Sequence, residues 1–250
     1  MNLSDSNVSY ATEFSVLHKA GTRGITNKGW MESRQTFSFG EYHNIKRKHF
    51  GVLRVLNDDS LEAGMGFGMH PHDNMEIINI LLEGELEHKD NIGNSARIKK
   101  GDVQVISAGT GVFHSEYNIS QEQPVKFLQI WLYPNQKNVT PRYDQITLKE
   151  NNSKNRFQQI LSPNPEDEGV WIHQQSWFHM GLFNGGLTIE YTIKKEGNGV
   201  YVFMINGNAK IGNQVIEKRD GFGIWNTQKL TITIGESEAE ILLMEVPMMI

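Results

Sequence analysis

The sequence predicts an all-β protein built from two small barrels in tandem. Three observations support this prediction. Short runs rich in Val, Ile, Phe and Leu recur between turn residues, helical periodicity is scarce, and the two halves of the chain carry a similar pattern. A chain of 250 residues with 38% hydrophobic and 21% charged residues can also fill two packed cores and is too apolar for a disordered protein.

Eight apolar runs are the expected strands. They are residues 50–56, 77–82, 103–106 and 125–133 in the first half, and 187–193, 200–205, 221–225 and 241–246 in the second. Between Pro134 and Gly169 the apolar pattern fades and polar residues dominate. We therefore expect an N-terminal barrel in residues 1–138 and a C-terminal barrel in residues 139–250, the latter preceded by a polar connecting segment to about residue 169.

The two halves resemble each other weakly. Residues 82–85 (LEGE) followed by 99–103 (KKGDV) are similar to residues 205–208 (INGN) followed by 218–222 (KRDGF), as a duplicated barrel would produce. The histidines are unevenly shared, because seven of the nine precede residue 115 and only His173 and His179 follow it. We expect a polar site in the first barrel alone.

Charge and composition exclude several classes of function. The net charge is −5, which gives no broad attraction for nucleic acid, so direct nucleic-acid binding is not expected. The chain has no cysteine, which excludes disulfides and thiolate sites and leaves His and carboxylate groups as the strong metal ligands. The first fifteen residues lack a secretory pattern, and no apolar stretch reaches the length of about eighteen that a membrane span needs. We expect a cytoplasmic monomer without membrane contact.

Two short motifs carry the chemistry. In an extended strand His70 and His72 point to the same face about 7 Å apart, and His114 and Glu116 repeat that arrangement. An isolated His-x-His is more often structural, but the second pair favours one divalent metal held by His70, His72, His114 and Glu116, with up to two coordination positions open. These donors suit Fe(II), Mn, Co, Ni, Zn or Cu(II), and their likeness to the two-His-one-carboxylate triad makes Fe(II) the expected metal.

These motifs resemble those of the cupin superfamily. The residues that match its two motifs are Gly64, His70, His72, Glu76 and Gly84, and then Gly101, Gly109, His114 and Asn118. The first-motif glutamate is displaced by one position, Ser107 replaces a proline, and two extra residues precede His114. Because Glu76 and Ile77 would point to opposite faces of a strand, Glu116 is the better fourth ligand.

A longer stretch, over about residues 30 to 134, resembles the pirin family. The runs that carry this resemblance are residues 36–40, 50–59, 70–72, 82–90, 107–111 and 114–116. The resemblance implies a bicupin, that is, two tandem jelly-roll-like cupin barrels, with three His and one Glu on a metal in the first barrel and no ligands in the second. It further implies a quercetin (flavonol) 2,3-dioxygenase that uses O₂ and releases carbon monoxide.

Two other functions stay open. A non-catalytic, metal-binding or redox-sensing regulator that acts through protein partners would use the same ligands without a substrate-sized pocket. A sugar isomerase on a cupin scaffold would need polar and basic groups near the metal, whereas Met, Phe and Gly dominate around His70 and His114. This composition favours a flavonol-like aromatic substrate.

The remaining residues have weaker assignments. In a dioxygenase Glu116 would be a ligand and possible base that accepts the flavonol 3-hydroxyl proton, and Glu76 would orient a ligand imidazole or else be a solvated strand residue. Asn118 and Gln129 would line the cavity, or close a turn and face solvent respectively.

Aromatic and outlying histidine side chains complete the set. Phe37, Phe39, Phe67 and Phe113 would wall an apolar pocket or pack in the core. His43 and His88 lie in expected turns, and we expect both at the surface.

Overall fold

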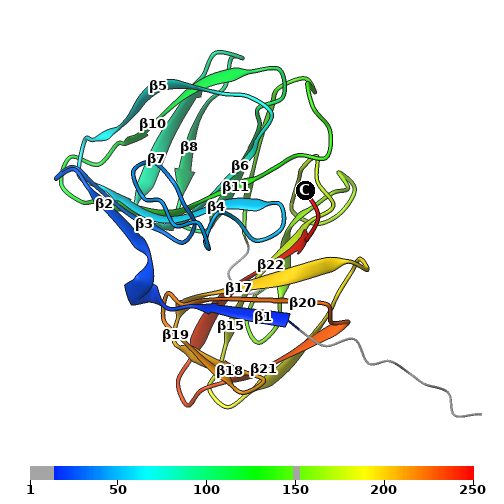
Figure 1. The fold of residues 1–250 in the computed structure, drawn as a ribbon. Helices are drawn as coiled ribbons and strands as arrows, with labels where there is room; N and C mark the ends of the chain where they lie inside the picture. Colours follow the sequence, from blue (N-terminus) through cyan, green and yellow to red (C-terminus); the bar gives the residue numbers. More distant parts are fainter. Residues whose placement is uncertain (1–13, 149–152) are drawn as a thin grey trace, which may run out of the picture.

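The computed structural model describes residues 14–148 and 153–250, which form two β-barrels lying one against the other (Figure 1). The predicted all-β class is confirmed. The described residues include only a single turn of 3₁₀ helix, η1 (Ala20–Thr22), and no α-helix. Within those residues, no helix is long and apolar enough to span a membrane.

The N-terminal barrel consists of a seven-stranded and a four-stranded sheet. The larger sheet has the spatial order β12 (Arg142–Thr147), β9 (Asp102–Ser107), β6 (Glu76–Glu83), β11 (Val125–Leu132), β4 (Leu53–Leu61), β3 (Met31–Gln35) and β2 (Gly24–Asn27). The smaller sheet has the order β5 (Gly66–His72), β10 (Val112–Asn118), β7 (Glu85–Asp90) and β8 (Ser95–Lys99). All these neighbours are antiparallel, so side chains alternate between the barrel interior and the outside.

The C-terminal barrel repeats this plan. Its larger sheet has the order β1 (Phe14–His18), β20 (Gly221–Trp225), β17 (Asn198–Asn206), β22 (Ala239–Pro247), β15 (Trp177–Phe183), β13 (Gln158–Ser162) and β14 (Val170–Trp171). Its smaller sheet has the order β16 (Thr188–Thr192), β21 (Lys229–Ile234), β18 (Asn208–Ile211) and β19 (Gln214–Glu217). Each of the eight apolar runs in the sequence overlaps a strand in one of the two larger sheets or in β16.

The internal similarity in the sequence has a structural basis. Gly84 joins β6 to β7 with φ of 79°, and Gly207 joins β17 to β18 with φ of 77°. Both glycines adopt the left-handed conformation that other residues avoid, which explains why the two halves share this residue at corresponding turns.

Strand pairing does not follow the division at residue 138 that the sequence suggests. β12 lies beyond that residue but pairs with β9 in the N-terminal barrel. At the other end, β1 pairs with β20 and completes the C-terminal barrel (Figure 1). The two barrels therefore exchange their terminal segments, because each strand joins the sheet edge that offers unpaired backbone groups.

The two larger sheets pack against each other through one apolar core. Leu56, Ile80 and Leu128 face outward from the N-terminal barrel and share this core with Phe203 and Leu242 of the C-terminal barrel. Because the outward faces of these strands are occupied by the partner barrel, the residues between them, such as Asn57, Asn79 and Gln129, face the barrel interior.

The interiors of the two barrels differ in character. The C-terminal barrel is filled by apolar side chains, among them Val202, Met204 and Ile232. The N-terminal barrel has one apolar cluster around Leu86 and Phe127 and another around Ile77, with polar side chains between them. The polar middle of the N-terminal barrel is where the histidines lie.

Candidate metal centre

Two adjacent strands of the smaller sheet position the histidines. His114 on β10 lies directly opposite His70 on β5, and His72 follows two residues later on the same face of β5. The register shifts between His114 and Glu116, so a β-bulge lies beside the site. The sequence spacing thus becomes one cluster because two paired strands carry alternate inward residues.

The three imidazoles form a group that could hold a metal ion. One ring nitrogen from each of His70, His72 and His114 lies within 4.8 Å of the others. The Nδ1 of His70 donates to the carbonyl of Gly68 at 2.7 Å, which leaves its Nε2 free, as in many metal-bound histidines. Both ring nitrogens of buried His114 have no hydrogen-bond partner. Unpartnered buried nitrogens that converge in this way fit a cation.

Burial keeps the imidazoles of His72 and His114 neutral. The pKa of His72 is lowered to about 3, first by burial and then by the nearby rings of His114 and His70. The pKa of His114 is likewise lowered to about 3, first by burial and then by His70 and His88. A neutral imidazole has a free lone pair, so His72 and His114 are ready to bind a metal at neutral pH.

Glu116 lies on the wall of the same cavity, but outside the 4.8 Å group. Its fully buried carboxylate accepts hydrogen bonds from the side-chain amides of Asn79 and, at 3.1 Å, Gln129. Burial raises the pKa of Glu116, while the charges of His88 and His70 and these hydrogen bonds lower it. Gln129 therefore faces the interior rather than solvent and holds Glu116.

Glu116 lies over a row of amides that crosses the larger sheet. The strand register aligns six side chains on neighbouring strands: Gln35, Asn57, Gln129, Asn79, Gln104 and Gln145. Asn79 also donates to Gln104 at 2.8 Å. This row was not predicted, although single amides inside the strands β4, β6, β9 and β11 were a signal for it.

A cavity of about 570 Å³ opens beside the histidines. Aromatic side chains wall it, with Phe39 edge-on to Trp131 at 5.2 Å and Trp30 edge-on to Phe67 at 5.6 Å between ring centroids. Trp131 also lies 4.8 Å from the ring of His72. The cavity is large enough for a small organic ligand and brings it to the imidazoles.

The four candidate phenylalanines divide between cavity, core and surface. Phe39 and Phe67 line the cavity. Phe37 packs in the core between the barrels, and Phe113 is 48% exposed because it faces outward on β10. The two tryptophans of the wall, Trp30 and Trp131, were missed by the sequence analysis, and their positions near the strand ends gave little signal.

Two polar predictions have a clear outcome. Asn118 closes a turn, because its side-chain amide donates to the carbonyls of Leu61, Glu62 and Gln123 at 2.8–3.2 Å. His88 is not at the surface but fully buried, where its Nε2 donates to Asp90 at 3.0 Å. Its ring centroid lies 5.5 Å from that of His114, so His88 is a neighbour of the histidine cluster. The prediction that His88 lies in a turn at the surface was wrong. His43 is exposed, as predicted.

Glu76 lies at the opposite face of β6 from the histidines. Its carboxylate accepts from the hydroxyl of Ser107 at 2.7 Å, and burial raises its pKa to about 7. Among the residues that the structure describes, no hydrogen bond joins Glu76 to His70, His72 or His114. The parity of the strand explains this: Ile77 and Asn79 point inward, so Glu76 points towards the partner barrel.

Buried polar groups of the C-terminal barrel bond to one another. Buried Glu245 accepts from Tyr191, the backbone of Lys194 and Lys195, and the side chain of Asn198, all at 2.8–3.0 Å. His179 is buried nearby as a single imidazole. Within residues 14–148 and 153–250, the three-histidine group in the N-terminal barrel is the one cluster suited to a metal.

Comparison with known proteins places this architecture in a family. Residues 15–132 match the family model described as pirin, and residues 159–246 match the one described as the quercetinase C-terminal cupin domain. A pirin-like protein from Caulobacter vibrioides is 32% identical over 223 residues, covering 89% of this chain and 95% of its own. This chain belongs to the pirin family. The predicted bicupin fold is thereby confirmed.

Other pirin relatives have names that refer to an activity or a metal. A quercetin 2,3-dioxygenase from Escherichia coli K12 is 39% identical over 235 residues, covering 92% of this chain and 98% of its own. The crystal structure of the bacterial pirin YhhW from Escherichia coli, in complex with nickel(II), superposes with a TM-score of 0.88 at 37% identity. That comparison covers 94% of this chain and 99% of YhhW.

Proposed function

We propose that this pirin is a metal-dependent quercetin (flavonol) 2,3-dioxygenase. One observation carries the proposal: the three-histidine cluster opens directly into an aromatic-walled cavity of about 570 Å³. A metal-sensing regulator that acts through protein partners needs the ligands but not a cavity of this size. The name of the Escherichia coli K12 relative supports the same activity.

His70, His72 and His114 would hold the metal, with Glu116 as the fourth ligand. Their donor set, three neutral imidazoles and one carboxylate, suits a divalent transition ion. Fe(II) remains our expected metal, and the nickel(II) complex of YhhW supports Ni as the main alternative. When bound, the ion would supply Lewis acidity that lowers the pKa of a flavonol 3-hydroxyl.

Glu116 would accept the proton of that hydroxyl. Burial already raises the pKa of this carboxyl group, so a proton placed on it is less unfavourable than on an exposed glutamate. The amides of Asn79 and Gln129 fix the carboxylate towards the cavity. A buried acceptor with a raised pKa is what a general base in a dry site requires.

The cavity lining would orient a flat, polyhydroxylated ring system. Trp30, Phe39 and Phe67 offer apolar faces for the aromatic rings, and they exclude water from the reacting atoms. Asn57, Gln35 and Ser33 lie along the other wall, where amide and hydroxyl groups can bond to substrate hydroxyls. This combination of apolar walls with a polar side matches flavonols better than sugars.

The decisive experiment is an assay with metal-reconstituted protein. Loss of quercetin absorbance should accompany O₂ consumption and carbon monoxide release, and the His70→Ala variant should lose this activity. The matched control is His179→Ala, which removes a buried imidazole from the C-terminal barrel and should retain full turnover. Absence of turnover with Fe, Mn, Co, Ni and Cu would refute the dioxygenase proposal.

The ligand assignment has a separate test. Elemental analysis should find one metal per chain in the wild-type protein and in His179→Ala. We expect His114→Ala to bind the ion at least about 100-fold more weakly, since one of few strong donors is lost. Unchanged affinity in His114→Ala would contradict the assignment, whatever the activity assay shows.

A further inference from the structure

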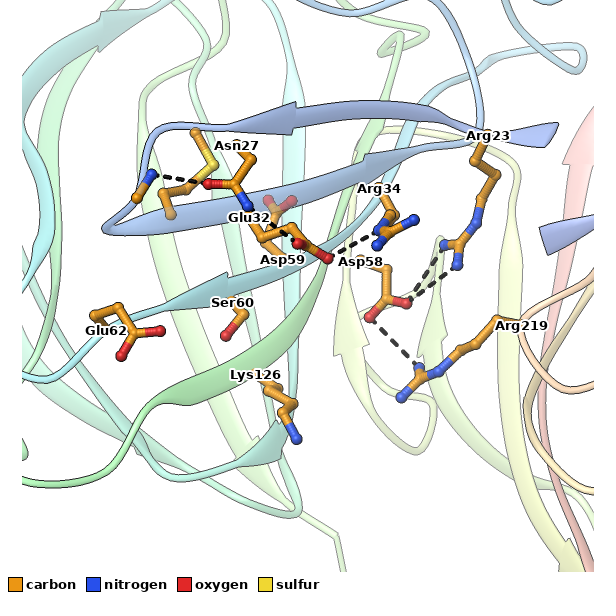
Figure 2. Close-up of a pocket in the computed structure, with 12 residues that line it drawn as sticks. Arg23, Asn27, Glu32, Arg34, Asp58, Asp59, Ser60, Glu62, Lys126 and Arg219 are labelled. Atoms are coloured by element: carbon orange, nitrogen blue, oxygen red, sulfur yellow. Dashed lines mark hydrogen bonds and ion pairs between the residues drawn. The ribbon is translucent and has the colours of Figure 1, made fainter. Parts of the chain in front are cut away.

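A second cavity lies where the N-terminal barrel meets a turn of the C-terminal barrel (Figure 2). Its volume is about 440 Å³. The residues that line it are Arg23, Asn27, Gly29, Met31, Glu32, Arg34, Asp58, Asp59, Ser60, Glu62, Lys126 and Arg219. Almost all come from the N-terminal barrel, and Arg219 reaches in from the turn between β19 and β20. Nothing in the proposed dioxygenase reaction uses this cavity.

Two guanidinium groups share one carboxylate at the end of this cavity. Arg23 approaches one oxygen of Asp58 at 3.4 Å through both Nη atoms, and Arg219 approaches the other oxygen at 3.6 Å (Figure 2). These contacts are long for charge-assisted hydrogen bonds, which are commonly about 2.7–2.9 Å. The Nη1 of Arg219 is buried and forms no hydrogen bond. One donor at this end of the cavity, Nη1 of Arg219, therefore has no acceptor within hydrogen-bond distance.

The guanidinium group of Arg23 is almost fully buried at this end of the cavity. Only 6% of its side chain is exposed, so water does little to compensate its charge. Burial lowers the pKa of Arg23, and the positive charges of Arg219 and Arg34 also lower it. The carboxylate of Asp58 raises it. The Nε of Arg23 donates to the carbonyl of Ala20 at 3.4 Å and its two Nη atoms donate to Asp58, so the donor left for a further anion is Nη1 of Arg219.

The other cations along the cavity are paired. Arg34 pairs with Glu32 at 2.9 Å, and Lys126 pairs with Glu83 at 2.8 Å. Glu62 lies at the opposite end from Arg23 and Arg219 (Figure 2). Asp59 also lines the cavity, and burial raises the pKa of its carboxyl group to about 7. In the ion pairs of the described residues, Arg23 and Arg219 share the carboxylate of Asp58.

The turn that carries Arg219 is held in an unusual conformation. Arg219 has a φ of 65°, in the left-handed region that costs a non-glycine residue roughly 1 kcal/mol. Its backbone amide donates to the carbonyl of Met204, which fixes the turn against β17. The side chain is thereby directed across the barrel junction towards Asp58.

We propose that this cavity binds a small anion, a molecule with a carboxylate or phosphate group held between Arg23 and Arg219. The forked donors of two guanidinium groups suit either kind of group. The cavity shares Met31 and Asp59 with the metal-side cavity, so the bound anion lies behind the wall of the candidate active site. It is a second ligand site, independent of the proposed dioxygenase activity.

Isothermal titration of the full-length, metal-loaded protein tests this site. The probes are sodium phosphate and sodium succinate, each compared with sodium chloride at the same ionic strength. We expect saturable, one-to-one binding of at least one probe, and the probe that binds more tightly identifies the phosphate or the carboxylate as the preferred group. Absence of saturable binding by both probes would overturn the proposal.

Four variants locate the binding. Arg219→Gln should weaken it about tenfold or more, because forked, charged hydrogen bonds are lost, and Arg219→Lys should bind with intermediate affinity. Lys229→Gln is the matched control, since it removes a cation of the same barrel that lies outside the cavity and pairs with Glu190. His70→Ala should bind the anion as the wild type does. Unchanged affinity in Arg219→Gln, or lost binding in His70→Ala, would overturn the assignment.

Discussion

Asn79 connects the amide row to the candidate metal centre, and its replacement tests that connection. Its side chain is fully buried and donates to Gln104 at 2.8 Å and to the carboxylate of Glu116. The Asn79→Ala variant leaves one amide oxygen and one carboxylate oxygen without this donor. Both acceptors lie in the interior of the barrel, where the loss of a hydrogen bond lowers the free energy of unfolding more than it would at the surface.

The magnitude follows from these two lost hydrogen bonds. An unsatisfied buried acceptor costs about 1–3 kcal/mol, with the charged one at the upper end, so we expect a loss of about 2–5 kcal/mol in the free energy of unfolding. For a chain of 250 residues this corresponds to a fall of about 5–15 °C in Tm. The pKa of Glu116 should also rise, because the hydrogen bond from Asn79 lowers it.

Urea denaturation of the metal-free protein, followed by tryptophan fluorescence, measures this loss. The matched control is Asn206→Ala, which removes an exposed amide at the end of β17 and should change stability by no more than about 0.5 kcal/mol. A loss below about 1 kcal/mol in Asn79→Ala, equal to that in the control, would refute the idea that the amide row supports Glu116.

Two further predictions concern pH and the contact between the barrels. Burial raises the pKa of Glu76 from 4.5 to about 7, so its folded form holds the proton more tightly than the unfolded chain does. The contribution of Glu76 to the free energy of unfolding is complete below about pH 4.5 and is lost as the pH rises through 7. Glu76→Gln should remove this pH dependence and be more stable than the wild type by up to about 3 kcal/mol at pH 8. Urea titrations across pH 4–8 measure the difference, and a constant difference would contradict the sign. Leu128→Ala should cost about 2–5 kcal/mol and lower one shared calorimetric transition, because Leu128 lies in the core that joins both barrels. Two separate transitions, only one of them shifted, would show that the barrels unfold independently.

The sequence was sufficient for the eight apolar strands and for the histidine cluster. Both depend on local alternation: β6, β9, β11, β17 and β22 are apolar runs of ordinary strand length, and His70 and His72 share a face because of their spacing. The pairing of His114 with His70 required adjacent strands, which the resemblance to pirins supplied. The family assignment therefore carried information that the spacing alone does not contain.

Long-range pairing and strand parity account for what was missed. β1 and β12 join sheets on the far side of the expected boundary, and no local pattern encodes such partners. His88 is polar and close to a turn, but it occupies an inward position of β7 between Leu86 and Asp90. The amide row appears only when six strands are placed in register, since each amide alone looks like one polar residue in an apolar strand.

The exchange of β1 into the C-terminal barrel bears on how the chain is made. β1 leaves the ribosome long before its partner β20, and His18 on β1 bonds to Tyr201, 183 positions later. The C-terminal barrel therefore closes only after the whole N-terminal barrel and β20 have been translated, which is a slow, non-local step. A fragment that begins after the N-terminal barrel would lack β1 and expose the edge of β20 to intermolecular pairing.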